Sequence, residues 1–313
     1  MTEQHPGITR QGSAGAPFDI ELPTLSRGTA DRDEDLRVPE RMTAAWPDAR
    51  VLRVGPTGAI AAVDGRPDWQ PATGPGLPHR GVLLGVVDGV DHWAIPDVDV
   101  EGPTLRELGL LLDDTDAGLL VSAVAVLGWH ARGAFCPTCG QPSVPAPDGW
   151  SRTCGQGHQE FPRTDPAAIV LVHDGADKMV LASQPNWPKG RFSVLAGFTE
   201  AGESLEQTVV REIGEEIGIP VTDVHYLASQ PWPFPRSLMI GFAARAEPGI
   251  ELHPRAGEIS EAHWVSRETV RRILAGDGNG AGWAGPGTGG AEIVLSGSIS
   301  IARRMIEGWA AAG

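Results

Sequence analysis

The sequence predicts an α+β chain with a β-rich first domain, a small cysteine-containing module and a larger domain of alternating strands and helices. Three observations support this prediction. Apolar runs broken by Gly and Asp dominate residues 50–65 and 80–95, a pattern typical of strands. All three cysteines lie in one turn-rich stretch, residues 136–154. Strand-like and helical patterns then alternate towards the C-terminus, which indicates a mixed sheet-and-helix domain.

These patterns divide the chain into four parts. We assign residues 1–38 to a flexible segment because they are polar and rich in Gly, Pro and Asp, 39–130 to the β-rich domain, 131–163 to the cysteine module and 164–313 to the last domain. A helix is predicted over residues 116–133, ending near Gly133. In the last domain, strands are predicted over 167–175, 178–184, 191–198, 224–234 and 238–246, and helices near 266–276 and over 298–312. Residues 276–290 are predicted to form a flexible surface loop without the Gly-Lys-Ser/Thr ending of a P-loop.

Bulk composition restricts the possible functions. The 313 residues are 41% hydrophobic, enough for a sizeable core, but contain no apolar run of eighteen residues and no apolar signal core at the N-terminus. We therefore expect no membrane-spanning helix and no secretory signal. Three cysteines make no disulfide framework, so a reducing, cytoplasmic environment is expected. The net charge of −15 argues against broad binding to phosphate backbones, yet it allows a phosphate substrate that metal cations contact.

One predicted helix, residues 205–217, concentrates the unusual chemistry. Ser204 with Gln207 makes a capping box at its start, and Gly218 supplies a residue that accepts positive φ at its end. Apolar residues repeat every four positions and predict a core-facing stripe; they are Leu205, Val209, Ile213 and Ile217.

Three glutamates lie along the edge of this stripe. With about 100° of rotation per residue, Glu216 falls in the sector of the apolar stripe, Glu212 borders it, and Glu215 lies further towards solvent. Burying carboxylates is costly unless they are paired or bind metal. Arg211 can pair with Glu215 at i,i+4, but one guanidinium cannot neutralise three carboxylates. Bound Mg²⁺ or Mn²⁺ ions can neutralise all three carboxylates. The alternative to a metal site is an acidic helix whose glutamates are solvated.

The spacing around this helix resembles the Nudix box at every defined position. The matching residues are Gly197, Glu203, Arg211-Glu212-Ile213, Glu215-Glu216 and Gly218-Ile219. The resemblance implies a Nudix α/β/α sandwich whose loop–helix–loop holds two or three Mg²⁺ or Mn²⁺ ions against a diphosphate, which water attacks. It implies Glu212 and Glu216 as the main metal ligands, Glu215 as a further ligand or water-orienting group, and the Ala196 carbonyl as an additional ligand. All three glutamates are catalytic candidates, and Glu216 is our choice of general base.

A second array, residues 229–237, has the sequence SQPWPFPRS. Rings held between prolines suit stacking on a flat base, although a structural turn is the alternative. The array resembles the SQPWPFPxS sequence that marks NADH pyrophosphatases within the Nudix family, with Arg236 at the variable position. The resemblance implies substrate contacts from Gln230, Pro231, Trp232, Pro233, Phe234, Pro235, Arg236 and Ser237.

The likeness to NADH pyrophosphatases extends to other positions. It implies a further metal ligand at Glu258, with Glu261 as the alternate, in the segment GEISEAHW. It implies substrate contacts from Phe161, Ile169, Phe198 and Ala302, and for each of these the alternative is core packing. The family reaction converts NAD(H) and water to nicotinamide mononucleotide and AMP. Related enzymes remove NAD caps from RNA, and homodimers are common.

The cysteine module resembles most of a zinc ribbon: Cys136-x-x-Cys139, fourteen residues, then Cys154. NADH pyrophosphatases commonly have four cysteines here, but no fourth cysteine follows Cys154. His158 is the natural substitute, because imidazole is a good zinc ligand. A Cys₃His zinc site is therefore expected, and the alternative is a metal-free knuckle held by packing.

Two other functions compete with NAD(H) hydrolysis. One is a Nudix diphosphatase that acts on another dinucleotide. The other is a nucleotide-sensing Nudix and zinc-ribbon protein that binds without hydrolysis, but such a sensor is expected to have lost box carboxylates. Every box carboxylate is present in this sequence, so the sequence favours the enzyme.

Overall fold

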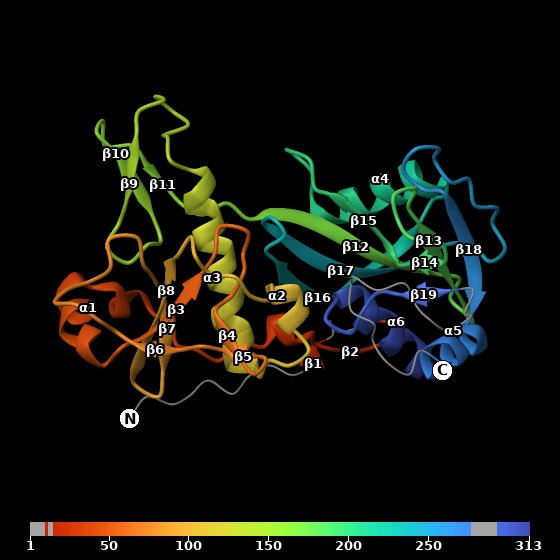
Figure 1. The fold of residues 1–313 in the computed structure, drawn as a ribbon. Coiled ribbons are helices and arrows are strands. Elements are labelled where there is room, and N and C mark those ends of the chain that lie inside the picture. The colour runs from red at the N-terminus through yellow and green to blue at the C-terminus, as the bar shows by residue number, and fades with distance from the viewer. Residues whose placement is uncertain (1–9, 12–14, 277–292) are drawn as a thin grey trace. The chain divides into compact units, whose positions relative to one another are not determined.

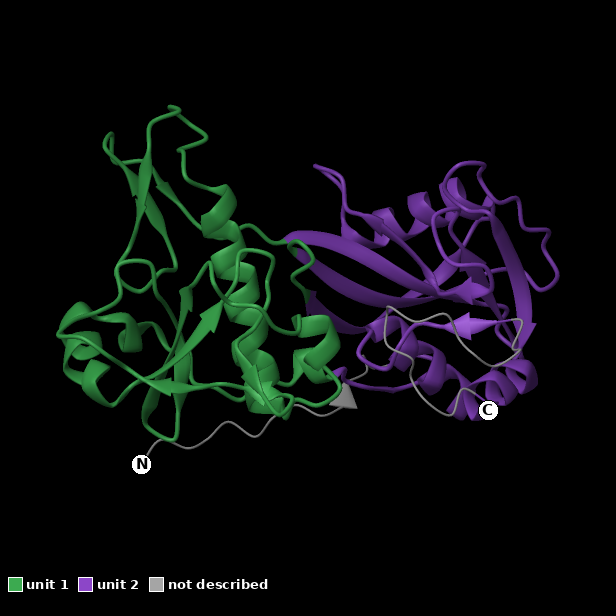
Figure 2. Cartoon of the chain, viewed as in Figure 1, with its two compact units in different colours: residues 1–7, 24–164, 232–236 green, residues 8–23, 165–231, 237–313 purple. Residues whose placement is uncertain are grey.

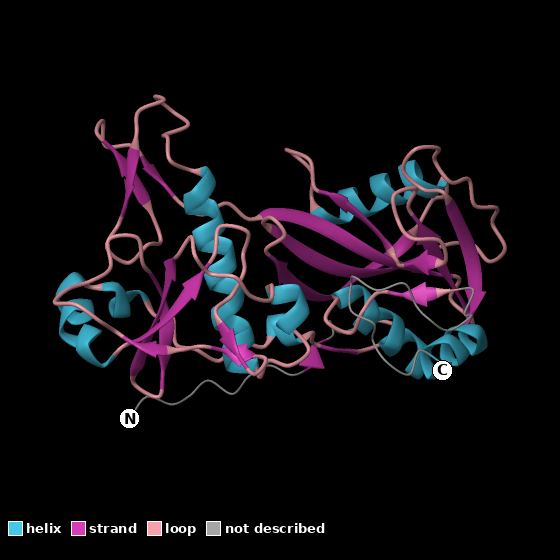
Figure 3. Cartoon of the chain, in the orientation of Figure 1, coloured by secondary structure: helices cyan, strands magenta, loops and turns pink. Residues whose placement is uncertain are grey.

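The structure is a computed structural model that describes residues 10–11, 15–276 and 293–313. Figure 1 shows the chain, and Figure 2 divides it into two compact units. The first unit contains residues 1–7, 24–164 and 232–236, and the second contains residues 8–23, 165–231 and 237–313. Each unit combines sheet and helix (Figure 3), which confirms the α+β prediction.

A six-stranded sheet forms the centre of the second unit, with the strand order β16-β17-β12-β13-β18 and with β15 paired to β12. The strands are β12 (Asp165–His173), β13 (Lys178–Ser183), β15 (Leu195–Phe198), β16 (Thr222–Trp232), β17 (Ser237–Arg245) and β18 (Glu261–Ser266). Strands β12 and β17 are parallel, whereas β15 runs antiparallel to β12. The remaining strands of this unit are β1 (Arg10–Gln11), β2 (Ile20–Glu21), β14 (Arg191–Phe192) and β19 (Val294–Leu295).

Helices cover both faces of this sheet, because side chains alternate along a strand. On β12, Ala168, Val170 and Val172 pack with helix α4 (Leu205–Ile217). Ile169 and Leu171 belong to the opposite core, to which helices α5 (Arg267–Gly276) and α6 (Ile301–Ala311) contribute. The result is the predicted α/β/α sandwich. The predicted loop at residues 276–290 falls, beyond Gly276, outside the described residues.

Residues 15–38, which the structure describes, differ from their prediction as part of a flexible segment. Phe18, Ile20 and Leu22 are buried in the same core as α6. The backbone here passes so close to α6 that a Cβ at Gly308 would lie 2.4 Å from the Asp19 carbonyl oxygen. Leu25 is also buried, so hydrophobic burial orders this part of the chain despite its polar composition.

The first unit has a four-stranded sheet in the order β6-β3-β8-β7. Its strands are β3 (Arg50–Val54), β6 (Gln70–Pro71), β7 (Val82–Val87) and β8 (Val90–Pro96), beside the small pair β4 (Ala62–Val63) and β5 (Arg66–Pro67). Its helices are α1 (Pro39–Ala45), α2 (Leu105–Leu108) and α3 (Asp114–Arg132), and the 3₁₀ turns are Thr24–Ser26, Glu34–Arg37 and Trp46–Asp48. The predicted helix is thus present, and Gly133 caps it. Trp46 and Trp93 pack edge-to-face in the core.

The cysteine module is a three-stranded sheet at the end of α3. It consists of β9 (Ser143–Pro145), β10 (Arg152–Cys154) and β11 (Gln159–Glu160), in the order β11-β10-β9. Among the described residues, no helix has the length and apolar character needed to cross a membrane.

Candidate active site

Helix α4 carries the glutamates and begins and ends as its sequence predicts. The Ser204 side chain accepts a hydrogen bond from the Gln207 backbone N–H, and the Gln207 side chain accepts one from the Ser204 N–H. Gly218 closes the helix in the left-handed conformation, with φ of 70°. This capping fixes the rotation of α4, and the rotation decides which carboxylates face the core.

The three glutamates differ in exposure as the helical wheel predicts. Glu216 is 6% exposed, and the side chains of Glu212 and Glu215 are 15% and 44% exposed. The carboxylates therefore line the border between the core below α4 and solvent. A solvated acidic helix does not bury one of its glutamates, so that alternative fails for Glu216.

Arg211 organises the acidic residues that lie towards solvent. Its Nε and Nη2 donate to the two oxygens of Glu203 at 2.5 and 2.8 Å. Nη1 lies 2.9 Å from Glu212 and 3.2 Å from Glu215, and Nη2 also donates to the Phe198 carbonyl at 3.0 Å. The hydrogen bond from Arg211, followed by that from the Glu200 N–H, lowers the pKa of Glu203 to about 2. Glu203 is thus a fixed anchor between the loop and the helix.

Glu216 lies outside the reach of Arg211. Its Oε2 is buried and has no hydrogen-bond partner among the described residues. Burial, followed by repulsion from Glu212, Glu258 and Glu215, raises the pKa of Glu216 to about 8. Burial also raises the pKa of Glu212. A buried, unpartnered carboxylate oxygen among three further carboxylates fits a hard divalent cation, which prefers oxygen ligands and offsets the repulsion.

The strand beside α4 is shaped to admit the Glu212 carboxylate. A Cβ built on Gly197 would lie 1.9 Å from the Glu212 carboxyl carbon and 2.0 and 2.2 Å from its oxygens. Gly197 is in β15, where it pairs with Ala168 of β12. A side chain at this position would therefore push the Glu212 carboxylate, the end of a flexible side chain, out of its present place. The preceding residue, Ala196, pairs with Ile169, so its carbonyl lies on the strand that adjoins the carboxylates.

The later acidic segment contributes one of its two candidates to this cluster. Glu258 is close enough to raise the pKa of Glu216 and lies 3.8 Å from Arg255. Glu261 instead lies 2.9 Å from His263 at the start of β18. Backbone contact between Arg255 and the Glu216 carbonyl links this segment to α4.

The predicted substrate residues are divided between the two units. The first unit contains Phe161, Trp232, Pro233, Phe234, Pro235 and Arg236, and the second contains Ile169, Phe198, Gln230, Pro231, Ser237 and Ala302. Phe161 and Phe198 are exposed and free of core packing. The Trp232 and Phe234 rings meet edge-on at 5.0 Å, and the Arg106 guanidinium lies over both, 4.2 Å from the Phe234 centroid.

Three of these residues have structural partners inside the second unit. Ile169 and Ala302 are buried in one core, which agrees with their alternative interpretation as core residues. Gln230 is completely buried: its Nε2 donates to the Ile299 carbonyl at 2.7 Å, and its Oε1 accepts from the Ile301 N–H at 2.8 Å. The side-chain amide of Gln230 thus holds the start of α6.

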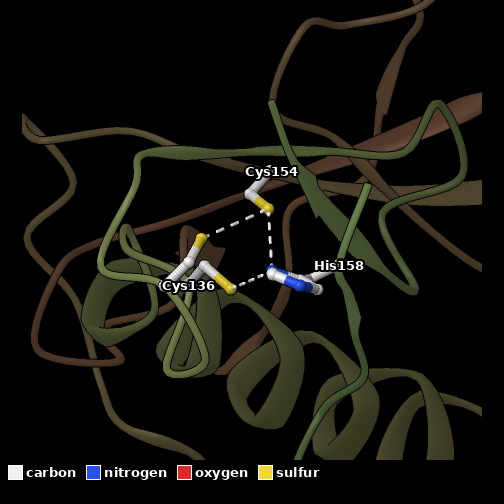
Figure 4. Close-up of side chains that lie close together, drawn as sticks. Cys136, Cys154 and His158 are labelled. Atoms are coloured by element: carbon white, nitrogen blue, oxygen red, sulfur yellow. Dashed lines mark hydrogen bonds between the residues drawn. The ribbon is translucent and has the colours of Figure 1, made fainter. Parts of the chain in front are cut away.

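The cysteine module gathers the four predicted zinc ligands. Figure 4 shows the Cys136 and Cys154 sulfurs and the His158 ring pointing towards one another. The His158 Nδ1 lies 3.6 Å from each of these sulfurs, and the Cys139 and Cys154 sulfurs are 3.7 Å apart. All four ligand atoms lie within 4.8 Å of one another.

These distances fit a tetrahedral zinc ion. Bonds of about 2.3 Å to sulfur and about 2.05 Å to nitrogen give edges of about 3.8 Å between sulfurs and about 3.6 Å between sulfur and nitrogen. Burial raises the pKa of the Cys136 thiol. Hydrogen bonds to its sulfur, led by those from the Cys139 and Thr138 N–H groups, outweigh burial and lower this pKa to about 6. A thiolate is the form that binds metal. His158 thus completes a four-residue cluster in which only three members are cysteines.

Sequence reasoning missed two arginine contacts. The sequence predicts only the pair of Arg211 with Glu215, whereas the strongest contact of Arg211 is with Glu203, eight residues earlier. The contact of Arg106 with the aromatic array has no local signal in the sequence, because Arg106 precedes Trp232 by 126 positions.

Comparison with known proteins agrees with this geometry. A family model described as the NUDIX domain matches residues 163–282, and one described as the NADH pyrophosphatase zinc ribbon domain matches residues 132–160. The chain is 47% identical over 316 residues to the NAD-capped RNA hydrolase NudC of Mycobacterium bovis (strain BCG / Pasteur 1173P2), with 95% of this chain and 98% of that protein covered. The chain belongs to the Nudix hydrolase family. As a Nudix hydrolase it uses Mg²⁺ or Mn²⁺, and its ribbon carries Zn²⁺.

Other Nudix hydrolases resemble shorter parts of the chain. The human NAD-capped RNA hydrolase NUDT12 is 37% identical over 210 residues, which cover 64% of this chain and 43% of that protein. A solved NUDIX hydrolase from Nitrosomonas europaea is 20% identical, with a TM-score of 0.37, and the match covers 43% of this chain and 78% of that one.

Proposed function

We propose that this Nudix hydrolase cleaves the diphosphate bond of NAD(H), giving nicotinamide mononucleotide and AMP, and that it removes NAD caps from RNA 5′ ends. The observation that carries the hydrolytic part is the buried, unpartnered Glu216 oxygen within the carboxylate cluster. The NAD part is supported by the matched NADH pyrophosphatase ribbon, the complete SQPWPFPRS array and the similarity to proteins named NAD-capped RNA hydrolases.

In this proposal, Glu212 and Glu216 are the main ligands of the divalent ions, and Glu215, Glu258 and the Ala196 carbonyl complete the set. Bound divalent ions supply positive charge that offsets the diphosphate and lower the pKa of water. Glu216 accepts the proton of the water that attacks phosphorus, and the bond from that phosphorus to the bridging oxygen breaks. Arg211 keeps Glu212 and Glu215 in position through its contacts with Glu203 and both of them.

The aromatic array is proposed to bind the nucleotide, with Phe161 and Phe198 as exposed rings available for stacking. In the zinc ribbon, Cys136, Cys139, Cys154 and His158 are the proposed ligands. This assignment keeps the zinc structural, because four protein ligands leave no open position for a substrate.

Substrate preference tests the proposed function. We expect Mg²⁺- or Mn²⁺-dependent release of reduced nicotinamide mononucleotide and AMP from NADH. From NAD-capped RNA we expect nicotinamide mononucleotide and a 5′-monophosphorylated RNA. Chromatography gives kcat/KM for both substrates. ADP-ribose serves as the competing substrate. Preference for ADP-ribose over NADH would support another dinucleotide diphosphatase, and tight NADH binding without product would support a nucleotide sensor.

A homodimer in the cytoplasm completes the proposal. The three free cysteines suit a reducing compartment, and the dimer rests on analogy with NADH pyrophosphatases. Light scattering of the purified chain tests the dimer, since a monomeric mass would contradict it.

A further inference from the structure

One residue of α2, Arg106, contacts both rings of the aromatic array, residues 229–237. Its guanidinium carbon lies 4.2 Å from the centroid of the Phe234 ring and 5.5 Å from that of the Trp232 ring. The two rings meet edge-on with their centroids 5.0 Å apart and their planes at 80°. All three residues belong to the first unit, and Figure 2 colours residues 232–236 with that unit. A single cation therefore lies over both rings of the motif that is proposed to bind the nucleotide.

This arrangement restricts the rings without covering them. A guanidinium over an aromatic face is attracted by the negative charge of the π system, and its planar shape also lets it stack on the ring. Trp232 and Phe234 are half-buried, so each ring keeps part of its surface open to solvent. The contact with Arg106 thus limits the rotation of the two side chains and leaves ring surface on which a base can stack.

The backbone of Arg106 is itself fixed by the local structure of α2. The Thr104 N–H and hydroxyl groups donate to one Glu107 carboxylate oxygen at 2.7 and 2.9 Å, and this contact is part of a capping box. Leu105 and Leu108, which flank Arg106 in the helix, are 0% and 2% exposed. Arg106 therefore projects from an anchored turn, and the fold sets where its side chain begins.

Two other roles for Arg106 compete with ring positioning. One is direct contact with a substrate phosphate, and the other is a link that only stabilises the first unit. The position of the guanidinium over the Phe234 ring favours positioning, because an arginine that binds phosphate directs its N–H groups at oxygen atoms. The three roles predict different effects on KM, on thermal unfolding and in variants that lack the rings.

We propose that Arg106 is a positioning residue for substrate binding, which orients Trp232 and Phe234 so that their open surfaces stack on a base of the substrate. The proposal rests on the proposed function, because that function assigns the nucleotide to the aromatic array. It gives the first unit a part in substrate recognition, whereas the carboxylates that bind the divalent ions lie in the second unit.

Steady-state hydrolysis of NADH with Mg²⁺ is the first experiment. We expect Arg106→Ala to raise KM about three- to tenfold, the size of a lost cation–π contact, and to change kcat less than about twofold. Stacking stabilises the bound substrate and the transition state equally, so its loss appears in KM. Arg106→Lys keeps the charge but not the planar group, so its KM should lie between those of wild type and Arg106→Ala.

The matched control is Arg37→Ala. Arg37 is also a half-buried arginine of the first unit, and its guanidinium carbon lies 4.6 Å from the centroid of the Trp150 ring. Its removal deletes the same kind of contact away from the array and should leave KM at the wild-type value. Thermal unfolding compares the stability of both variants, and an equal rise of KM in both would overturn the proposal.

A double-mutant cycle tests whether Arg106 acts through the rings. In the background Trp232→Leu/Phe234→Leu, Arg106→Ala should change kcat/KM for NADH less than about twofold, because the side chains that it positions are absent. The full effect of Arg106→Ala in that background would assign Arg106 to direct contact with the substrate and overturn the proposal.

Hydrogen exchange separates failure of this proposal from failure of the proposed function. The Phe234 N–H donates to the Trp232 carbonyl at 2.7 Å, so its exchange rate reports the order of the array without any substrate. We expect Arg106→Ala, but not Arg37→Ala, to raise this rate at least about threefold. If wild type does not hydrolyse NADH, the proposed function fails, and faster exchange in Arg106→Ala alone still supports ring positioning. Exchange at the wild-type rate in Arg106→Ala would overturn it.

Discussion

At the scale of single residues, Glu216 is the most informative position. A carboxylate that is 6% exposed and has one unpartnered oxygen is unfavourable for folding unless something compensates for it. Arg211 pairs with Glu203, Glu212 and Glu215, and among the described residues no ion pair joins it to Glu216. One guanidinium leaves most of the negative charge of this cluster unbalanced, and a divalent ion is the compensation that the Nudix family uses.

The raised pKa of Glu216 makes the metal-linked stability depend on pH. At pH values between 4.5, the ordinary pKa of a glutamate, and about 8, Glu216 holds a proton in the folded chain that it has lost in the unfolded chain. The metal-free protein therefore loses stability as pH rises through that window, and the loss is complete above it. A bound cation replaces the proton, so we expect the increase in Tm caused by Mg²⁺ to grow between about pH 6 and about pH 8.5.

Scanning calorimetry with and without Mg²⁺ measures this growth. Glu216→Gln removes the titrating group and should give an increase in Tm that is small and independent of pH. An equally steep pH dependence in Glu216→Gln would show that another group is responsible.

Gly197 and Gly214 form a matched pair of glycines. A methyl group at Gly197 would overlap the Glu212 carboxylate, whereas one at Gly214 on α4 would meet open space. We expect Gly197→Ala to lower kcat at least about 100-fold through displacement of a metal ligand. Gly214→Ala should retain activity and raise stability by up to about 1 kcal/mol, because alanine favours the helix. Steady-state kinetics and thermal unfolding of both variants check this, and full activity of Gly197→Ala would contradict the arrangement of the site.

At the scale of elements, α4 and the ribbon are the parts that local sequence predicts best. The start, end, apolar stripe and carboxylate order of α4 all follow from residues within the helix and its caps. The ribbon follows from the spacing of Cys136, Cys139, Cys154 and His158. Both elements are encoded by short-range chemistry, which one sequence displays directly.

The N-terminal segment shows where that approach fails. Phe18, Ile20 and Leu22 alternate with polar residues as a half-buried strand does. That signal was present, but the average composition of residues 1–38 concealed it. The Gly197–Glu212 and Arg211–Glu203 contacts were not predictable in the same way, because they depend on how β15 and its loop pack against α4.

Zinc content tests the fourth ribbon ligand. We expect the purified wild type to contain about one zinc per chain and His158→Ala to contain much less, because three ligands leave the tetrahedron incomplete. His158→Cys should retain zinc, since it restores the four-cysteine pattern. His253→Ala, outside the ribbon, is the control. Mass spectrometry of the metal together with hydrogen exchange over residues 136–160 measures the effect, and equal zinc in His158→Ala and wild type would exclude His158.

At the scale of the whole molecule, the two units have different electrostatic characters. The second unit gathers carboxylates around α4, and the first unit gathers arginines around a cavity. The net charge allows a phosphate substrate that metal cations contact, but it does not reveal the arginines around the cavity, because Arg80, Arg106, Arg132 and Arg152 are far apart in the sequence. The net charge of a chain does not tell where its charges lie, so only the structure reveals that acidic and basic residues gather in different units.

Hydrolysis of NADH by wild type, Glu216→Gln and Glu206→Gln tests the metal-binding role of the carboxylate cluster most directly. Glu206 is an exposed glutamate in the first turn of α4 and serves as the matched control. We predict that wild type and Glu206→Gln release AMP and reduced nicotinamide mononucleotide only with Mg²⁺ or Mn²⁺, and that Glu216→Gln is at least about 100-fold slower. Wild-type rates in Glu216→Gln, or a wild type that binds NADH and releases neither product with any divalent ion, would contradict this role.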